Sequence, residues 1–265
     1  MQTSPLLTTL LEKPRIGLMT DMDGTISPIV EHPEAAQVTP HSRELLEALH
    51  AHLALVAVVS GRGASDLRTR VGLADLVYVG NHGLETWQDG QVVPVPETAT
   101  FRPGLEKTLR ALEPHLVPGI FIEDKGATVS VHYRQTADPA EVAAMLEPIL
   151  ENLTAQHGLS LFQGRKVFEL RPPVPINKGT AFHHLIIQHR LDGALYLGDD
   201  VTDADAMRVA RQLRNDGTCH AVTIGVGAED APAVVRENAD IMLGSVYDVE
   251  SFLDWLLKAV SASAT

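Results

Sequence analysis

The chain has 265 residues, of which 45% are hydrophobic, and a formal net charge of −13 at pH 7. This length suits one large α/β domain or two smaller ones, and the hydrophobic fraction permits a real core. The negative charge argues against a general nucleic-acid binder, because such domains usually carry a basic patch or stripe.

The cysteine content and the N-terminal residues indicate in which cellular compartment the protein is located. The single Cys219 cannot form an internal disulfide, which fits a reducing compartment. The N-terminus lacks a basic region followed by a long apolar segment, and no stretch approaches the roughly 20 apolar residues of a membrane span. We therefore expect a soluble, cytoplasmic protein with no membrane partner and no nucleic-acid partner.

The first predicted strand, residues 16–20, delivers two carboxylates onto a Gly-Thr turn. Side chains two residues apart share one face of a strand, so Asp21 and Asp23 are placed to converge on one ligand. Two like charges this close are costly unless a cation lies between them, and Mg²⁺ takes oxygen ligands of this kind. The same residue types also build ordinary capped turns, so both interpretations stay open for this stretch alone.

Prolines at positions 28, 33 and 40 oppose regular structure after this turn and indicate a flap over the site. Two apolar strands follow, residues 53–59 and 76–79, and they run into Ser60-Gly61-Arg62 and Gly80-Asn81-His82. Open α/β sheets bind ligands at this end of their strands, where a hydroxyl followed by Gly and Arg suits a phosphoryl oxygen. Alternatively, Ser60 caps the helix predicted at 64–71, and His82 is a hydrogen-bonded loop histidine.

Between about residues 100 and 175 the pattern changes from buried runs to helix-strand-strand units in the order αββαββ. Strands are predicted at 119–123, 127–133, 160–163 and 166–170, with a tight turn at Gly164-Arg165. We therefore expect an inserted α+β domain over 100–175 and a core domain made of 1–99 and 176–265. Polar side chains alternate with apolar ones along 127–133, so one sheet face is either a substrate-binding face or a solvated one.

The core pattern resumes after a proline-rich linker at 171–175. Lys178 lies at the start of a helix, where the dipole disfavours a cation, so this lysine needs an anion unless it is simply exposed. The strand at 194–197 is followed by Asp199, Asp200 and Asp203, which indicates a hard-cation site. Asp203 also suits the start of the next helix. Strands at 221–225 and 241–243 and a helix at 247–260 complete the core.

Four motifs stand in order at the predicted strand ends and helix start: Asp21-x-Asp23-Gly-Thr, Ser60, Lys178 and Gly198-Asp199-Asp200. The whole chain thereby resembles the haloacid dehalogenase superfamily of phosphotransferases, and the insertion resembles its C2-type cap. Within that superfamily it is similar to the trehalose-6-phosphate phosphatase family at residues 25–29, 58–62, 80–85, 123–126, 130–134 and 198–203. The resemblance implies an α/β fold, with a Rossmann-like parallel-sheet core and an inserted α+β cap.

The resemblance also implies an activity, that of a phosphoric monoester hydrolase. The reaction would be Mg²⁺-dependent hydrolysis of trehalose 6-phosphate through an aspartyl-phosphate, the last step of trehalose biosynthesis. Asp21 would be the nucleophile, and Asp23 would act as general acid and base. Mg²⁺ would be held by the Asp21 carboxylate, the Asp23 main-chain carbonyl and Asp199. Asp200 and Asp203 would either lie beside the metal or orient Lys178.

The remaining implied residues would bind the substrate. Ser60, Gly61 and Lys178 would hold the phosphate. The residues implied at the sugar are Arg62, Asn81, His82, Glu123, Lys125, His132 and Glu169. The family commonly carries other residues where Met22, Ala204 and Met207 stand, and none of these three is assigned to the chemistry.

Two other functions remain alternatives on the sequence alone. One is a phosphatase for a different sugar phosphate, of the sucrose-6-phosphate or mannosyl-3-phosphoglycerate type, although the stretches at 80–85 and 123–126 favour trehalose 6-phosphate. The other is a non-catalytic sugar-phosphate sensor, which would not need both Asp21 and Asp23. We expect a small-molecule substrate as the partner and a monomer or weak oligomer.

Overall fold

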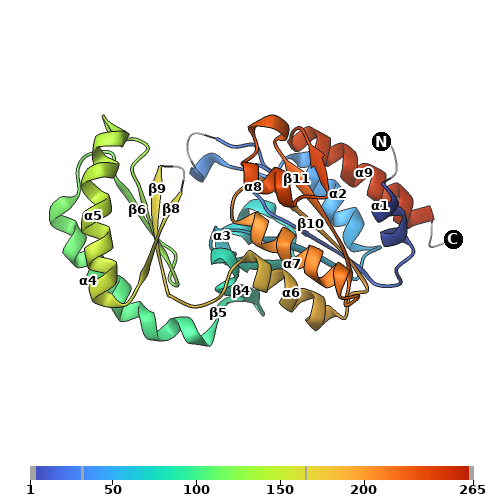
Figure 1. The fold of residues 1–265 in the computed structure, drawn as a ribbon, viewed down its shortest axis with the longest axis horizontal. Helices are drawn as coiled ribbons and strands as arrows, with labels where there is room; N and C mark the ends of the chain where they lie inside the picture. The colour runs from blue at the N-terminus through green and yellow to red at the C-terminus, as the bar shows by residue number, and fades with distance from the viewer. Residues whose placement is uncertain (1–3, 31–32, 165, 263–265) are drawn as a thin grey trace. The chain divides into compact units, whose positions relative to one another are not determined.

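The computed structural model describes residues 4–30, 33–164 and 166–262. Contacts within the chain divide it into two compact units (Figure 1). Unit 1 consists of Met1–Val92 and Ile176–Thr265, and unit 2 consists of Val93–Pro175. Unit 2 is therefore inserted, in the sequence, between the two segments of unit 1.

Unit 1 is built on an eight-stranded sheet with the order β12-β11-β10-β1-β2-β3-β4-β5. Its pairs are parallel from β12 to β3, and β4 is antiparallel to β3. The central strands are buried at every position, as expected for parallel strands covered on both faces. The strands are β1 (Ile16–Thr20), β2 (Leu55–Val59), β3 (Val77–Gly80), β4 (Glu85–Gln88), β5 (Gln91–Pro94), β10 (Gly193–Gly198), β11 (His220–Val226) and β12 (Ile241–Leu243).

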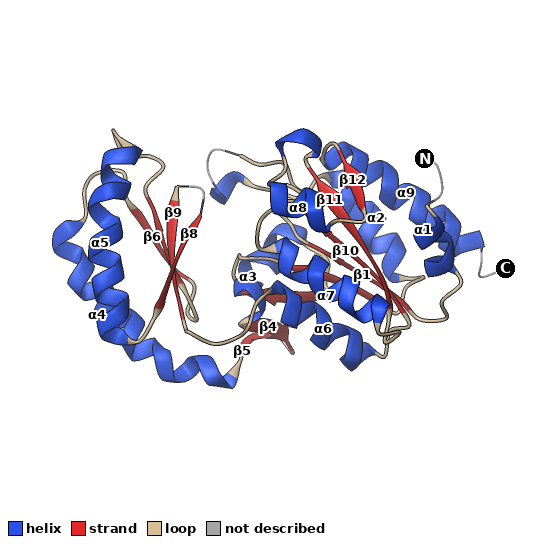
Figure 2. Cartoon of the chain, viewed as in Figure 1, coloured by secondary structure: helices blue, strands red, loops and turns tan. Residues whose placement is uncertain are grey.

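Helices cover both faces of this sheet (Figure 2). Neighbouring residues of β1 point to opposite faces: Leu18 packs in the core under α2 and α9, and Met19 packs in the core under α6 and α7. The helices are α1 (Pro5–Leu11), α2 (Pro40–His50), α3 (Ala64–Val71), α6 (Lys178–His189), α7 (Asp203–Asn215), α8 (Ala233–Asn238) and α9 (Val246–Ala262). Across the described ranges, none of the helices has both the length and the apolar character needed to cross a membrane.

The sequence does not predict the β4–β5 pair or the short helix α8. Asp89 and Gly90 connect β4 and β5, and both have positive φ, 48° and 84°. Two successive positive φ values are typical of the Asp-Gly turn that joins adjacent strands. The flap predicted after the first strand contains a 3₁₀ turn at Pro33–Ala35, and its residues 31–32 lie outside the described residues.

Unit 2 contains a four-stranded antiparallel sheet with the order β6-β7-β9-β8 and two helices. Its elements are α4 (Arg102–Leu112), β6 (Phe121–Asp124), β7 (Val129–His132), α5 (Pro139–His157), β8 (Ser160–Gly164) and β9 (Val167–Arg171). This order confirms the predicted αββαββ fold. The turn predicted at Gly164-Arg165 includes Arg165, which lies outside the described residues.

The two faces of the unit 2 sheet differ in character. One face lies against α4 and α5 (Figure 2). Apolar side chains such as Val131 and Phe168 pack there. Strand alternation sends the neighbouring side chains to the other face, and the register places Glu123, Ser130 and Glu169 in one row there. We call this second surface the open face. It carries most of the polar residues that the sequence assigns to sugar binding in the insertion.

Asp138 offers a test of how unit 2 holds its long helix. Its Oδ1 atom accepts the backbone N–H groups of Ala140 and Glu141 at the start of α5, both at 3.0 Å. Asp138→Ala removes this cap, so we expect the free energy of unfolding to fall by about 1 kcal/mol. Urea denaturation measures the change, with Glu151→Gln, an exposed position on α5, as the control. Equal stability of the two variants would contradict the capping role.

Candidate active site

Loops at one edge of the unit 1 sheet bring the predicted polar residues together. Asp21 follows β1, Ser60 follows β2, Asn81 follows β3 and Asp199 follows β10. These four strands are neighbours and parallel, so their carboxyl ends meet at the same edge. The Asp21 N–H donates to the Leu197 carbonyl at 2.8 Å, which ties the ends of β1 and β10 together.

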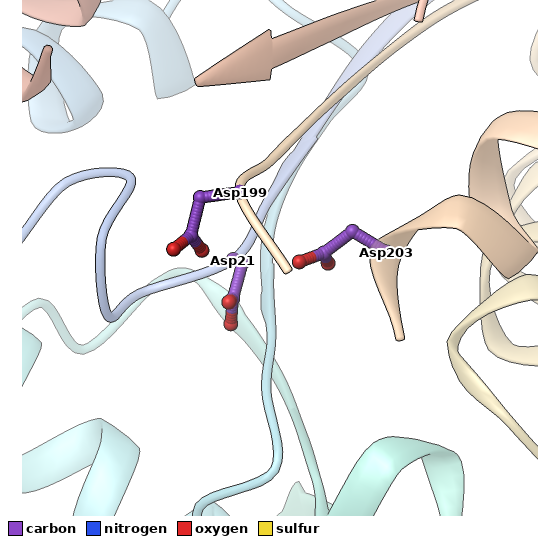
Figure 3. A group of neighbouring side chains, drawn as sticks. All are labelled: Asp21, Asp199 and Asp203. Carbon is purple, nitrogen blue, oxygen red and sulfur yellow. The ribbon is translucent and has the colours of Figure 1, made fainter. Parts of the chain in front are cut away.

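Three carboxylates, two of them buried and one half-buried, form a cluster at this edge. Asp21, Asp199 and Asp203 each offer one oxygen within 4.8 Å of the others (Figure 3). Asp21 is 5% exposed and Asp203 is fully buried. The Oδ1 atoms of Asp21 and Asp199 are buried and have no hydrogen-bond partner. Buried carboxylate oxygens without partners are costly, and a hard divalent cation with oxygen ligands satisfies them. The donor set therefore fits such a cation.

The crowding of like charges shows in the pKa values of these groups. Burial raises the pKa of Asp21 to about 7; Lys178 opposes this rise, and Asp203 and Asp23 add to it. Burial, together with Asp21 and Asp203, raises the pKa of Asp199 to about 9. A cation bound between these carboxylates would favour their ionised forms and reverse both shifts.

Lys178 lies beside this cluster and is 2% exposed, so it is not a surface lysine. Its Nζ atom lies 3.1 Å from Asp21 Oδ2 and 2.8 Å from Asp203 Oδ1. Burial alone would lower the pKa of Lys178, but Asp203 and Asp21 raise it above its ordinary value. Asp203 is itself held by the Tyr196 hydroxyl at 2.7 Å and the Asp200 N–H at 3.0 Å. A charged lysine is thereby fixed next to Asp21, and the same Asp203 begins α7.

The Ser-Gly-Arg stretch and the Asn-His stretch form one structure. The His82 N–H donates to the Ser60 carbonyl at 2.9 Å, and the Asn81 N–H donates to the Arg62 carbonyl at 2.8 Å. A Cβ atom at Gly61 would lie 2.5 Å from His82 Nε2, so glycine leaves room for the imidazole in this position. The Ser60 Oγ atom also accepts the Arg62 N–H at 3.4 Å. Two stretches about 20 residues apart therefore share one wall of the site.

Gly24 has a similar role in the acidic turn. Its φ is +77°, and a Cβ atom there would lie 2.1 Å from Asp199 Oδ2. Glycine at this position allows both the left-handed backbone and the close approach of Asp199.

Asp23 and Arg62 form a two-pronged ion pair. Arg62 Nε lies 2.6 Å from Asp23 Oδ2, and Arg62 Nη2 lies 2.9 Å from Asp23 Oδ1. The resemblance assigns Arg62 to the sugar. The sequence gives no sign that Arg62 also contacts Asp23, because the two residues are 39 positions apart.

The sequence also does not single out Glu85, which is buried and accepts the Ala64 N–H at 2.7 Å at the start of α3.

In unit 2, side chains from three strands or their ends interact on the open face. Lys125 Nζ lies 3.3 Å from Glu169 Oε1, and His132 Nε2 lies 3.0 Å from Glu123 Oε2. Arg171, which the sequence does not single out, donates from Nε to Glu169 Oε2 at 2.8 Å. The four residues assigned to the sugar in the insertion are therefore brought together within this unit.

Comparison with known families agrees with these geometries. Residues 19–238 match the family described as Trehalose-phosphatase. The chain belongs to the trehalose-phosphatase family. A relative in this family, the trehalose-phosphate phosphatase of Mycobacterium tuberculosis (strain ATCC 25618 / H37Rv), is 36% identical over 83% of this chain and 59% of its own length. The trehalose-phosphate phosphatase B of Arabidopsis thaliana is 30% identical over 92% of this chain and 67% of that protein. The chain thus spans about three-fifths of the length of the mycobacterial relative.

Solved structures share the fold of this trehalose-phosphatase family member. The C-terminal domain of C. albicans trehalose-6-phosphate phosphatase has a TM-score of 0.79 at 24% identity and covers 96% of both chains. A haloacid dehalogenase-like hydrolase from Bacteroides thetaiotaomicron has a TM-score of 0.65 at 16% identity, over 91% of this chain and 99% of that one. The predicted fold class and family are confirmed. The family implies a divalent metal, in agreement with the carboxylate cluster.

The three residues that differ from the common family pattern are core residues. Met22, Ala204 and Met207 are fully buried. Met22 and Met207 pack among hydrophobic neighbours, so these two residues change the filling of the core.

Without a divalent cation, we expect the stabilising effect of Asp21 and Asp199 to fall as pH rises. In the folded protein the pKa of Asp21 is about 7 and that of Asp199 is about 9, whereas the ordinary value is 3.8. Between the ordinary pKa and the raised pKa of each group, the folded protein therefore binds more protons than the unfolded chain. The contribution of these two groups to the free energy of unfolding therefore decreases from about pH 4 toward about pH 9. Added Mg²⁺ should offset the loss, and more strongly at high pH, because it binds the ionised carboxylates.

Urea denaturation at about pH 6 and about pH 9, with EDTA or with Mg²⁺, measures both effects. Asp199→Asn serves as the matched variant, since it removes one charge from the cluster and should weaken the response to Mg²⁺. A response to Mg²⁺ that is the same at both pH values, or unchanged in this variant, would contradict the metal site.

Proposed function

We propose that this protein is a Mg²⁺-dependent phosphatase that hydrolyses trehalose 6-phosphate to trehalose and phosphate, the last step of trehalose biosynthesis. The observation that carries the proposal is the buried contact of Asp21 with Lys178 beside the carboxylate cluster, in a chain of the trehalose-phosphatase family. Relatives named trehalose-phosphate phosphatase, at 30–36% identity, support the same substrate. No feature of the described residues favours another sugar phosphate or a sensor.

The chemistry follows from the groups at the sheet edge. Asp21 attacks phosphorus and forms an aspartyl-phosphate while the bond to the sugar oxygen breaks. Asp23 gives a proton to that oxygen and later takes one from the water that hydrolyses the intermediate. Ser60 and Gly61 bind phosphoryl oxygens, and Lys178 neutralises part of the charge, because positioning and charge neutralisation are most of what phosphoryl transfer requires.

Mg²⁺ would be held by the Asp21 carboxylate, the Asp23 main-chain carbonyl and Asp199. When bound, it supplies positive charge that offsets the repulsion between the nucleophile and the phosphate. The unpartnered Oδ1 atoms of Asp21 and Asp199 support this assignment. Asp203 acts beside the metal by orienting Lys178, and Asp200 acts by holding Asp203.

We further propose that residues 100–175 form a cap that selects the sugar, on a core made of 1–99 and 176–265. Carboxylates and amines suit the hydroxyl groups of a disaccharide, and each charged hydrogen bond contributes about 1.5 to 3 kcal/mol. The residues assigned to the sugar are Arg62, Asn81, His82, Glu123, Lys125, His132 and Glu169. The cytoplasmic location and the monomeric or weakly oligomeric state stay predictions from the sequence.

Asp21→Asn should abolish turnover of trehalose 6-phosphate and leave the fold intact, because an amide is a poor nucleophile and has a similar shape. Phosphate release from a panel of sugar phosphates, with and without Mg²⁺, measures wild type and variant, and circular dichroism checks folding. Substantial residual activity in a clean preparation would contradict the nucleophile. Wild-type release from a different sugar phosphate in preference to trehalose 6-phosphate would overturn the substrate.

Glu123→Ala and Lys125→Ala should reduce kcat/KM for trehalose 6-phosphate far more than for a small aryl phosphate. Loss of one charged hydrogen bond corresponds to roughly a tenfold to hundredfold decrease. The control is Glu147→Ala, an exposed position on α5, where alanine is a good helix former. Equal losses on both substrates would refute selection by the open face.

A further inference from the structure

Asp23 lies at one end of a row of four alternating charges in unit 1. The row runs from Asp23 through Arg62 and Asp66 to Arg70, and each neighbouring pair is in direct contact. Arg62 is the residue next to Gly61, whereas Asp66 and Arg70 lie on α3. Neither Asp66 nor Arg70 has a part in the proposed binding of the metal or the phosphate, so their contacts need another explanation.

Arg62 is shared between two carboxylates. Two of its nitrogens bind both oxygens of Asp23, and its Nη1 atom donates to Asp66 Oδ2 at 3.1 Å. The Arg62 side chain is 13% exposed, so it is largely packed, while the Asp23 side chain is 35% exposed. A forked guanidinium grips a carboxylate in a defined plane. The orientation of the Asp23 carboxylate therefore depends on where Arg62 is held.

Asp66 holds Arg62 from the other side, and Arg70 holds Asp66. Arg70 Nε donates to the same Asp66 Oδ2 atom at 2.7 Å, which is favoured by their spacing of four residues on α3. Arg70 Nη1 donates to the main-chain carbonyls of Glu34 at 2.9 Å and Ala36 at 2.7 Å. Main-chain groups of the segment between the acidic turn and α2 thus anchor the far end of the row.

The contacts are more specific than a stability role requires. Asp66 is 38% exposed, and ion pairs with this much solvent access contribute little to folding. The Arg62 side chain, however, is held by Asp23 on one side and by Asp66 on the other, which limits the freedom of this long side chain. Catalytic groups lose much of their effect when they are displaced by about 1 Å.

We propose that Asp66 and Arg70 are positioning residues that hold the Asp23 carboxylate, through Arg62, in the place from which it exchanges a proton. The inference rests on the proposed function, in which Asp23 protonates the departing sugar oxygen. The P–O bond breaks with its electron pair on that oxygen, which then takes the proton from Asp23. An aryl oxygen with a low pKa leaves without a proton, so its departure does not depend on the position of Asp23.

Asp66→Asn tests the proposal, because it keeps the shape of the side chain and removes the charge that binds both arginines. We expect kcat for trehalose 6-phosphate to fall about tenfold to a hundredfold, with KM changed by less than about twofold. With p-nitrophenyl phosphate, the rate of nitrophenolate release in a single turnover, with enzyme in excess, should equal that of the wild type, since only that step is independent of the proton. Later turnovers should slow, because Asp23 also activates the water.

Two matched variants separate positioning from general damage. Asp66→Glu keeps the charge on α3 and should recover most of the lost kcat. Asp254→Asn breaks an ion pair with Lys258, also four residues apart, on α9, and it should leave both substrates unaffected. The proposal is overturned if Asp66→Asn keeps its kcat within about twofold, if the single-turnover rate with p-nitrophenyl phosphate falls as much as kcat, or if KM rises while kcat is unchanged.

A crystal structure of Asp66→Asn decides the point without reference to turnover. We expect the Asp23 carboxylate to be displaced or to occupy two rotamers, and an intact Asp23–Arg62 pair would overturn the inference whatever the substrate. The proposed function is tested separately, by measuring which substrates the wild-type protein hydrolyses. A wild-type protein that hydrolyses the aryl phosphate but not trehalose 6-phosphate would overturn the substrate, and the kcat comparison would then use the alkyl phosphate that it does hydrolyse.

Discussion

The site depends on one buried lysine held among carboxylates. Lys178 contacts Asp21 and Asp203, and Asp199 lies in the same cluster. Three carboxylates and one lysine leave two negative charges when all are ionised, which is the charge that a divalent cation neutralises. Because like charges in a buried place are costly, the rest of the site serves to hold them there. The Tyr196 hydroxyl on Asp203 is one such support.

The backbone makes this crowding possible. Parallel strands end at one edge, so residues that are far apart in the chain meet there without long loops. Gly24 leaves room for Asp199, and Gly61 leaves room for His82. The negative net charge of the whole protein does not prevent the proposed binding of an anionic substrate, because the cations that matter are placed locally. Lys178 lies beside Asp21, and Arg62 is shared between Asp23 and Asp66.

Most elements were predictable because their signals are local. Apolar runs gave the bounds of β1 and β12 without error, and the helix predicted at 64–71 has the bounds of α3. The pair β4–β5 escaped prediction because short, half-exposed strands lack such a run. The polar face of unit 2 was visible as alternation along residues 127–133. Only the register across β6, β7 and β9 shows that Glu123 and Glu169 lie in one row, since pairing between strands is not local information.

The sequence by itself determined the family, the α/β class and the candidate residues, because these depend on residue types in order at the ends of apolar strands. The tertiary structure alone decided which charges meet. It showed that Lys178 is buried against Asp203, and that Arg62 grips Asp23 and is backed by Asp66 and Arg70. The physical reason is that an ion pair depends on distances of a few ångströms between side chains, and spacing along the chain does not specify those distances once the loops between strands have folded.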